Sequence, residues 1–275
     1  MDIFSSILLG VVQGLTEFLP ISSSGHLILF QNLLGFREPE LLFDIGLHLG
    51  TLVAVCVFFG RDLRAMMVET VDFLASLLAR KKDLGQIKEY PQAYMLLWVL
   101  VGTIPTGCIG LWFKTPLESL FGSLRLVGFM LMCTGLILVV TWKLPENYTR
   151  RTSVGLFAAL AVGIAQGIAI IPGISRSGST IVCGMFCKLQ RETAARFSFL
   201  LSIPATLGAM AIQIASEGVG QGALPALAVG FMVSAVVGLL ALKILMGMVR
   251  KGRLYYFAPY CWAVGLLILF LSFRP

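Results

Sequence analysis

The sequence predicts an all-α integral membrane protein of one domain, residues 1–275, built as an inverted-topology repeat. Hydrophobic residues make up 57% of the chain, charged residues only 13%, and the mean hydropathy is +0.90. A soluble domain normally carries about 25% charged residues. The apolar residues gather in six long runs and two interrupted ones, and one short motif occurs twice. We therefore expect six transmembrane helices plus two re-entrant helical hairpins.

The six long runs each match the length of a membrane span, for which about 20 apolar residues are needed. They lie near residues 41–60, 92–113, 122–142, 192–215, 223–249 and 254–273.

The two interrupted segments, about 3–35 and 153–189, are apolar but broken by proline, glycine and serine. Pro20 interrupts the first segment, and Pro172 with Gly173 interrupts the second. Proline removes a backbone donor and glycine weakens a helix, so each segment should form two short helices joined by a turn. Such a hairpin enters the membrane and leaves on the same side.

Each half of the chain then consists of one hairpin followed by three spans, at about 1–143 and about 153–275. An odd number of spans places the second half in the opposite orientation, which makes an inverted repeat. The two hairpin tips should approach from opposite faces and meet near the midplane.

Charged residues in the connections support this topology. On one predicted side lie Arg61, Arg64, Arg80, Lys81, Lys82, Lys88, Lys143, Arg150, Arg151, Lys188, Arg191, Arg196, Arg250, Lys251 and Arg253. The opposite connections carry Arg37, Glu38, Glu40, Lys114, Glu118 and Glu217. The basic side should be the cytoplasm, with both termini outside. The net charge of +7 is explained in this way, and no basic stripe interleaved with aromatics points to nucleic acid.

The repeated motif covers residues 10–26 and 163–179, at a constant offset of 153. Identical pairs are Gly10/Gly163, Gln13/Gln166, Gly14/Gly167, Ile21/Ile174, Ser22/Ser175, Ser24/Ser177 and Gly25/Gly178. The first copy alone carries Glu17 and His26, and the second alone carries Arg176. One half therefore offers acid–base groups and the other an anion-binding group.

Arg176 is the expected anion-binding residue. A guanidinium beside hydroxyls and a glycine-rich turn suits phosphate oxygens, because its planar fork donates two hydrogen bonds. The short helix that begins near Gly178 adds free N–H groups. The alternative is an arginine that extends to the cytoplasmic interface and binds a lipid headgroup.

Glu17, Ser23 and His26 are the candidates for proton transfer and attack, with Ser22 and Ser24 beside them. A carboxylate in an apolar segment suits proton transfer, and His26 is a candidate base, nucleophile or proton donor. The alternative is structural, with Glu17 paired to a distant arginine and the serines capping a helix.

Asp44 and His48, one turn apart, are interpreted as a helix-start carboxylate with a hydrogen-bonding partner rather than as the rim of a site.

The stretches 13–26 and 172–180 resemble the signatures of the bacterial undecaprenyl-diphosphate phosphatase family, BacA/UppP, as do residues 43–51 and 196–204. The resemblance runs essentially end to end. It implies removal of the terminal phosphate from undecaprenyl diphosphate, recycling of the lipid carrier for cell-envelope synthesis, and bacitracin resistance. It also implies the bacterial cytoplasmic membrane, with the site open to the outer face. The partners would be the polyprenyl diphosphate and membrane lipids, and a homo-oligomer is compatible with this interpretation.

In that interpretation Glu17, Ser23, His26 and Arg176 are catalytic. The substrate-binding residues would be Gln13, Ser22, Ser24, Ser175, Ser177, Gly178 and Thr180. Either Ser23 or His26 would attack, and Glu17 would act as base or hold its partner in place. The family implies a divalent cation, Mg²⁺ or Ca²⁺, carried largely by the diphosphate, with Glu17 as a candidate ligand. The competing interpretation is a flippase or secondary transporter for polyprenyl phosphates, since inverted repeats with broken helices are typical of carriers.

Overall fold

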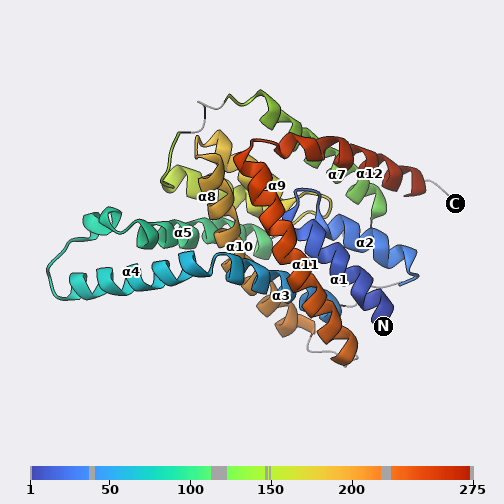
Figure 1. Cartoon of the computed structure of the whole chain (residues 1–275), viewed down its shortest axis with the longest axis horizontal. Coiled ribbons are helices and arrows are strands. Elements are labelled where there is room, and N and C mark those ends of the chain that lie inside the picture. The colour runs from blue at the N-terminus through green and yellow to red at the C-terminus, as the bar shows by residue number, and fades with distance from the viewer. Residues whose placement is uncertain are drawn as a thin grey trace.

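The computed structural model describes residues 2–36, 41–112, 123–145, 148, 150–217 and 224–272, and within these ranges the chain is helical (Figure 1). The α-helices are α1 (Ile3–Phe18), α2 (Ser23–Leu33), α3 (Leu41–Phe58), α4 (Gly60–Leu78), α5 (Pro91–Trp112), α7 (Leu124–Val139), α8 (Leu156–Ile168), α9 (Arg176–Phe186), α10 (Arg191–Glu217), α11 (Leu224–Arg250) and α12 (Ala258–Ser272). Short 3-10 turns are η1 (Leu84–Glu89), η2 (Val140–Lys143) and η4 (Leu254–Phe257). The β pairing within these ranges is one isolated bridge, between Arg151 and Leu189.

Most of the predicted spans are confirmed as helices. By length and composition, five helical stretches of the described chain are able to cross a membrane: Pro91–Trp112, Leu124–Lys143, Arg191–Ala215, Leu224–Arg250 and Leu254–Ser272. A sixth is counted if α3 is taken together with α4, to which it is bent by 69°. The chain is therefore a multi-pass membrane protein by its helices.

The two predicted breaks are also confirmed. α1 ends at Phe18 and α2 begins at Ser23, while α8 ends at Ile168 and α9 begins at Arg176. α1 and α8 are apolar, but each has fewer than 18 residues and is too short to count as a membrane span. Each segment is thus a pair of short helices with the motif at the turn between them.

One segment differs from the prediction. Residues 61–91, expected as a basic connection, contain the helix α4 followed by η1. Met66 and Phe73 of α4 are buried at helical spacing, and α4 packs along α5. Charged residues lower the hydropathy of this segment, so a search for apolar runs overlooks it. Arg196 of α10 is ion-paired with Asp62 of α4 at 2.5 Å, so this basic residue has a structural partner.

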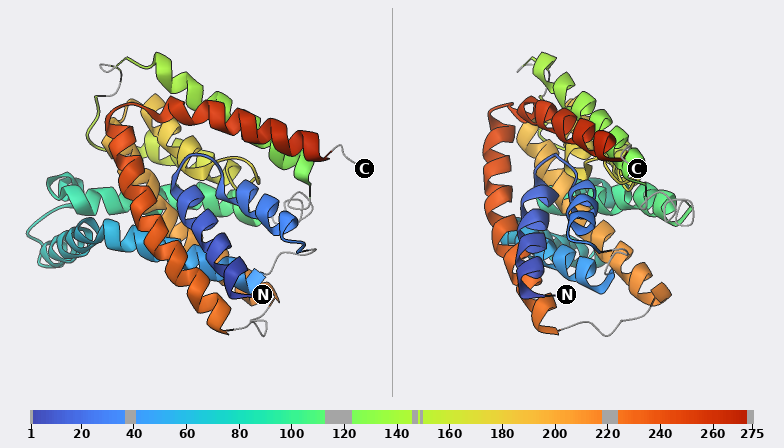
Figure 2. Two further views of the ribbon diagram at one scale, coloured as in Figure 1. Left: turned by 45° about the vertical axis from the view of Figure 1, so that its right-hand side comes forward. Right: turned by 90° about the vertical axis from the view of Figure 1, so that its right-hand side faces the viewer.

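Helix packing follows a pattern shared by the two halves. α1 packs against α11, and α8 packs against α5. These contacts need glycine, because a Cβ at Gly10 would lie 2.9 Å from the carbonyl oxygen of Gly230, and a Cβ at Gly163 would lie 2.1 Å from that of Gly102. α7 and α12 lie side by side, as Figures 1 and 2 both show.

The largest buried apolar cluster draws residues from α1, α3, α4, α5, α8, α9, α10 and α11. Its fully buried members include Phe197, Leu200 and Leu201 of α10 and Ile181 of α9. Because side chains from both halves interdigitate there, the end of α1 and the start of α9 are held in fixed positions.

Several predicted features lie outside the described residues. These are the charges Arg37, Glu38, Glu40, Lys114 and Glu118, the side chain of Glu217, and the span ends at 113, 122, 223 and 273.

Candidate active site

The turn between α1 and α2 is fixed by a serine cap. Ser22 has a positive φ of 68°, and its hydroxyl accepts a hydrogen bond from the backbone N–H of Gly25. An oxygen at this position satisfies one of the free N–H groups at a helix start. As a result Ser23 is the first residue of α2, and the turn returns the chain toward Glu17 near the end of α1.

The turn between α8 and α9 repeats this cap. The hydroxyl of Ser175 accepts from the N–H of Gly178 at 3.1 Å, and the N–H of Ser175 donates to Thr134 Oγ1 at 3.0 Å. Gly173 has a φ of 95°, and a Cβ there would lie 2.5 Å from the carbonyl oxygen of Val127. Only glycine fits such a position. The turn therefore presents Arg176 as the first residue of α9.

The two turns meet at Glu17. Its Oε1 is ion-paired with the Arg176 guanidinium, and its Oε2 accepts from Ser23 Oγ at 2.6 Å and from Gln13 Nε2 at 3.1 Å. Arg176 also donates to Thr206 Oγ1 of α10 at 2.8 Å. The structure thus brings together three of the predicted catalytic residues, Glu17, Ser23 and Arg176, together with Gln13.

Burial makes this cluster costly to assemble. The side chain of Glu17 is 7% exposed and that of Arg176 26% exposed. Removing such charges from water costs several kcal/mol per ion, and a well-packed apolar pair is often at least as stable. The pair is therefore weak evidence for stability and fits a site whose chemistry needs both charges. A serine that donates to a carboxylate is in position to lose its proton to it.

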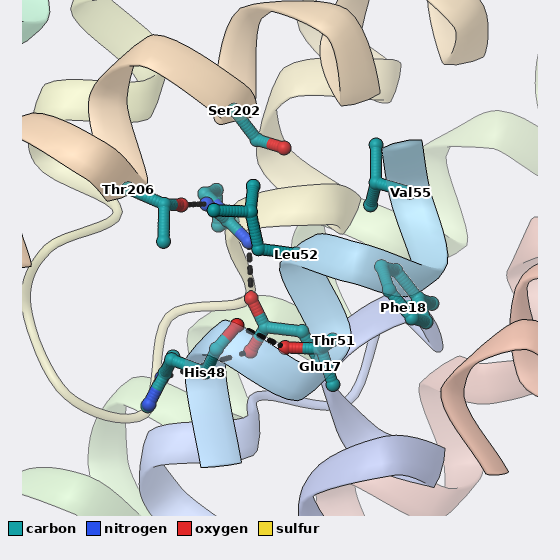
Figure 3. A pocket seen from close by; sticks show the side chains of 9 residues that line it. Glu17, Phe18, His48, Thr51, Leu52, Val55, Ser202 and Thr206 are labelled. Atoms are coloured by element: carbon teal, nitrogen blue, oxygen red, sulfur yellow. Dashed lines mark hydrogen bonds and ion pairs between the residues drawn. The ribbon is translucent and has the colours of Figure 1, made fainter. Parts of the chain in front are cut away.

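A small pocket opens onto Glu17 and Arg176 of this cluster, whereas Ser23 and Gln13 do not line it (Figure 3). Its lining residues are Glu17, Phe18, His48, Thr51, Leu52, Val55, Arg176, Ser202 and Thr206. Ser202 and Thr206 reach it from α10, opposite Glu17 of α1 and His48 of α3. Its lining combines the Arg176 guanidinium, a donor suited to phosphate oxygens, with hydroxyl groups of threonine and serine.

His26, a predicted catalytic residue, does not line this pocket. It is 3% exposed, and its ring lies parallel to that of Tyr260 with centroids 5.7 Å apart. Its Nδ1 donates to the carbonyl oxygen of Ser22 at 2.8 Å, because a carbonyl only accepts. Its Nε2 is hydrogen-bonded to Tyr260 Oη at 2.8 Å. Both ring nitrogens therefore have partners.

The predicted substrate-binding residues, Gln13 included, also lie outside the pocket lining. Ser22 and Ser175 cap helices, and Ser24 and Ser177 lie 3.3 Å from these caps through their hydroxyls. Thr180 is hydrogen-bonded to Ser198 at 2.5 Å. In this arrangement these residues shape the two turns, and substrate binding by them stays a prediction.

Comparisons with known proteins cover nearly the whole chain. A family profile described as bacitracin resistance protein BacA matches residues 6–267. The chain belongs to the BacA family. It is 48% identical over 270 residues to the undecaprenyl-diphosphatase of Desulfatibacillum aliphaticivorans, covering 97% of this chain and 98% of that protein. It is 44% identical over 274 residues to the undecaprenyl-diphosphatase of Desulforapulum autotrophicum, covering 99% of both chains.

This BacA-family protein also has pocket residues that sequence reasoning did not select. Thr51 and His48 lie on α3, and Ser202 and Thr206 lie one turn apart on α10. His48 was interpreted as a partner of Asp44, and its Nδ1 does bond the Asp44 carbonyl oxygen at 2.8 Å, but its other face lines the pocket. The signal that could have found His48, Thr51 and Ser202 is their place in the family-like stretches 43–51 and 196–204, beyond which Thr206 lies.

The pocket of this family member offers few donors for a metal ion. Within the described ranges, no group of three or more His, Cys, Asp or Glu side chains gathers closely enough to hold one. Glu17 is a carboxylate of the pocket, but it is already paired with Arg176. Mg²⁺ is commonly held by one or two carboxylates plus substrate phosphates. Any divalent cation bound here would therefore need oxygen ligands beyond the carboxylate of Glu17.

Proposed function

We propose that this chain hydrolyses undecaprenyl diphosphate to undecaprenyl phosphate and inorganic phosphate, and so recycles the lipid carrier for cell-envelope synthesis. The observation that carries the proposal is the cluster in which Glu17 contacts both Ser23 and Arg176. Membership of the BacA family and relatives named undecaprenyl-diphosphatase along the full chain support it.

Ser23 is the nucleophile in this proposal. Its hydroxyl is 2.6 Å from Glu17 Oε2, which takes its proton as Ser23 Oγ bonds to the terminal phosphorus. The bridging P–O bond breaks, and undecaprenyl phosphate leaves with the electron pair. His26 is the weaker candidate, because Ser22 and Tyr260 occupy both of its ring nitrogens.

Arg176 binds the phosphoryl oxygens and stabilises the charge spread over them in the transition state. The substrate anion would replace Glu17 as its partner, while Thr206 keeps the guanidinium in place by its 2.8 Å hydrogen bond. Release of Glu17 from the ion pair makes it a stronger base when Ser23 must lose its proton.

A divalent cation, Mg²⁺ or Ca²⁺, accompanies the diphosphate in this proposal, with Glu17 as its candidate ligand. When bound, such an ion would offset the charge of the phosphate oxygens.

We further propose an inverted repeat in the bacterial cytoplasmic membrane, with two re-entrant hairpins and the site open to the outer face. The exchanged packing supports it, because the first helix of each hairpin packs on the second span of the other half. In Figure 1 the start of α1 and the end of α12 lie at the right, while the α4–α5 connection with its lysines extends to the left. The start of α1 and the end of α12 thus lie opposite the basic connection.

The experiment that tests the activity is phosphate release from undecaprenyl diphosphate by the purified protein in detergent with Mg²⁺. Release that is lost in Ser23→Ala supports the proposal. A protein that releases no phosphate, but moves polyprenyl phosphate between leaflets of a vesicle, would be a flippase instead.

The topology has its own test. A cysteine placed at Gln86, in the exposed turn η1, should be labelled from the cytoplasmic side when the native cysteines have been replaced. Labelling of intact spheroplasts by an impermeant reagent would contradict the proposed orientation.

A further inference from the structure

His48 is a pocket residue to which the proposed first step gives no role. Its Nδ1 lies 2.8 Å from the carbonyl oxygen of Asp44, one turn earlier on α3. A carbonyl oxygen only accepts, so Nδ1 carries the proton. In the neutral ring, Nε2 therefore holds the lone pair, and the backbone bond fixes this tautomer.

That lone pair is directed toward the site. Nε2 lies 3.9 Å from Glu17 Oε2, beyond hydrogen-bonding distance, and the His48 side chain is 33% exposed. His48 lies near Glu17 in Figure 3, and Arg176 lines the same pocket. A water molecule that enters the pocket can therefore reach Nε2, because Glu17, itself an acceptor, does not occupy the Nε2 lone pair.

The other two acid–base candidates are less suited to receive a proton from water. Glu17 accepts from Ser23 and Gln13 on one oxygen and from Arg176 on the other. His26 is 3% exposed and bonded through both ring nitrogens. Among the titratable residues that line the pocket, His48 is thus the base with an accessible lone pair.

The proposed reaction needs such a base only in its second half. In the first half the leaving group is a phosphate, which departs without protonation. The second half must cleave a phosphoserine, and water is a poor nucleophile until a base takes its proton. Glu17 already holds the Ser23 proton at this stage and is needed to return it to the departing oxygen.

We propose that His48 is the catalytic base that activates the water for hydrolysis of phospho-Ser23, a role that rests on the proposed function. The water oxygen bonds to phosphorus, and its proton moves to His48 Nε2. The Ser23 Oγ–P bond breaks, and Glu17 returns its proton to Ser23. Inorganic phosphate leaves, and His48 then releases its proton to solvent.

The test separates the two halves in rapid-quench experiments on the full-length protein, using undecaprenyl diphosphate radiolabelled at the terminal phosphate, with Mg²⁺. His48→Gln keeps the size and polarity of the side chain but not its basicity. We expect it to form undecaprenyl phosphate in a burst of one equivalent at nearly the wild-type rate, followed by turnover slowed about 10²–10⁴-fold. Label should remain on the protein as alkali-labile phosphoserine, and a second substitution, Ser23→Ala, should remove it.

Two further variants keep the test decisive. Leu49→Ala changes the next residue of α3, whose side chain is an exposed hydrophobic, and should behave as wild type. His48→Ala should regain phosphate release when free imidazole is added, which a purely structural histidine would not allow. Equal slowing of burst and turnover, absence of rescue, or label on a residue other than Ser23 would each overturn the role of His48. The proposed function fails separately, if the wild-type protein releases no phosphate at all.

Discussion

The two copies of the motif share their architecture and differ in their chemistry. Ser22 and Ser175 cap the helices that follow them, each through the N–H of the glycine three residues later. The glycines at equivalent positions of α1 and α8 allow close approach to another helix in both halves. These positions are identical in the two copies because both turns need them.

Two of the differing pairs place reactive groups in the cluster around Glu17. Ser23 in the first copy corresponds to Arg176 in the second, and Glu17 corresponds to Ile170. In the proposed mechanism the first turn supplies a nucleophile and a base, and the second supplies a cation for the phosphate. A carrier needs only to coordinate its substrate, whereas this difference between the two copies favours reaction chemistry.

The largest loss of turnover should come from replacing Ser23, the residue of the first copy that corresponds to Arg176. Ser23→Ala removes the nucleophile and should lower turnover on the order of 10⁶-fold, as loss of a serine nucleophile does elsewhere. Substrate binding should survive, because Arg176 is unchanged. Phosphate release and equilibrium binding of the lipid diphosphate measure the two properties. A Ser23→Ala protein with measurable activity and an acid-labile phosphohistidine would identify His26 as the nucleophile.

The second-largest loss of turnover should come from replacing Glu17, the carboxylate of the first copy. Glu17→Gln keeps the shape but removes the base and the ion-pair partner of Arg176, so turnover should fall about 10²–10⁴-fold. Glu17→Asp, which keeps a carboxylate on a shorter side chain, should retain more activity than Glu17→Gln. A fully active Glu17→Gln enzyme would contradict Glu17 as the base for Ser23.

The arginine of the second copy should give a smaller loss. Arg176→Lys keeps the charge but loses the planar fork that binds two phosphate oxygens. Loss of one such donor costs about 10²–10³ in rate. Thr206→Val removes the hydrogen bond that positions the guanidinium and should cost less than Arg176→Lys. Near-normal phosphate release by the lysine variant would remove Arg176 from the phosphate site.

The sequence predicted the helices and breaks well because each follows from local composition. Apolar runs, the proline and glycine interruptions and the repeat are all visible without tertiary information. The helix α4 was overlooked, because its charges hide the apolar face formed by Met66 and Phe73.

From the sequence, only the residues of the candidate site that lie in the repeated motif were selected. Glu17, Ser23 and Arg176 lie in the repeated motif, and the structure brings them into contact, while their roles stay predictions. His48 and Thr206 reach the pocket from helices packed around it, and neither lies in the repeated motif. His26 lies in the motif, yet tertiary contact with Tyr260, 234 residues away, places it outside the pocket.

The smallest effects should come from the positions that the copies share. Ser22→Ala and Ser175→Ala each remove a helix cap and should lower the free energy of unfolding by about 1 kcal/mol, since both serines do the same structural work. Thermal unfolding in detergent checks the stability. The KM of Ser175→Ala should stay near the wild-type value, because Ser175 is 2% exposed and lies outside the pocket lining. Ser175→Asn is the matched control, since asparagine also caps helices and should restore the stability. Unchanged stability together with a raised KM in Ser175→Ala would instead make this serine a phosphate ligand, and the two copies would then share chemistry as well as architecture.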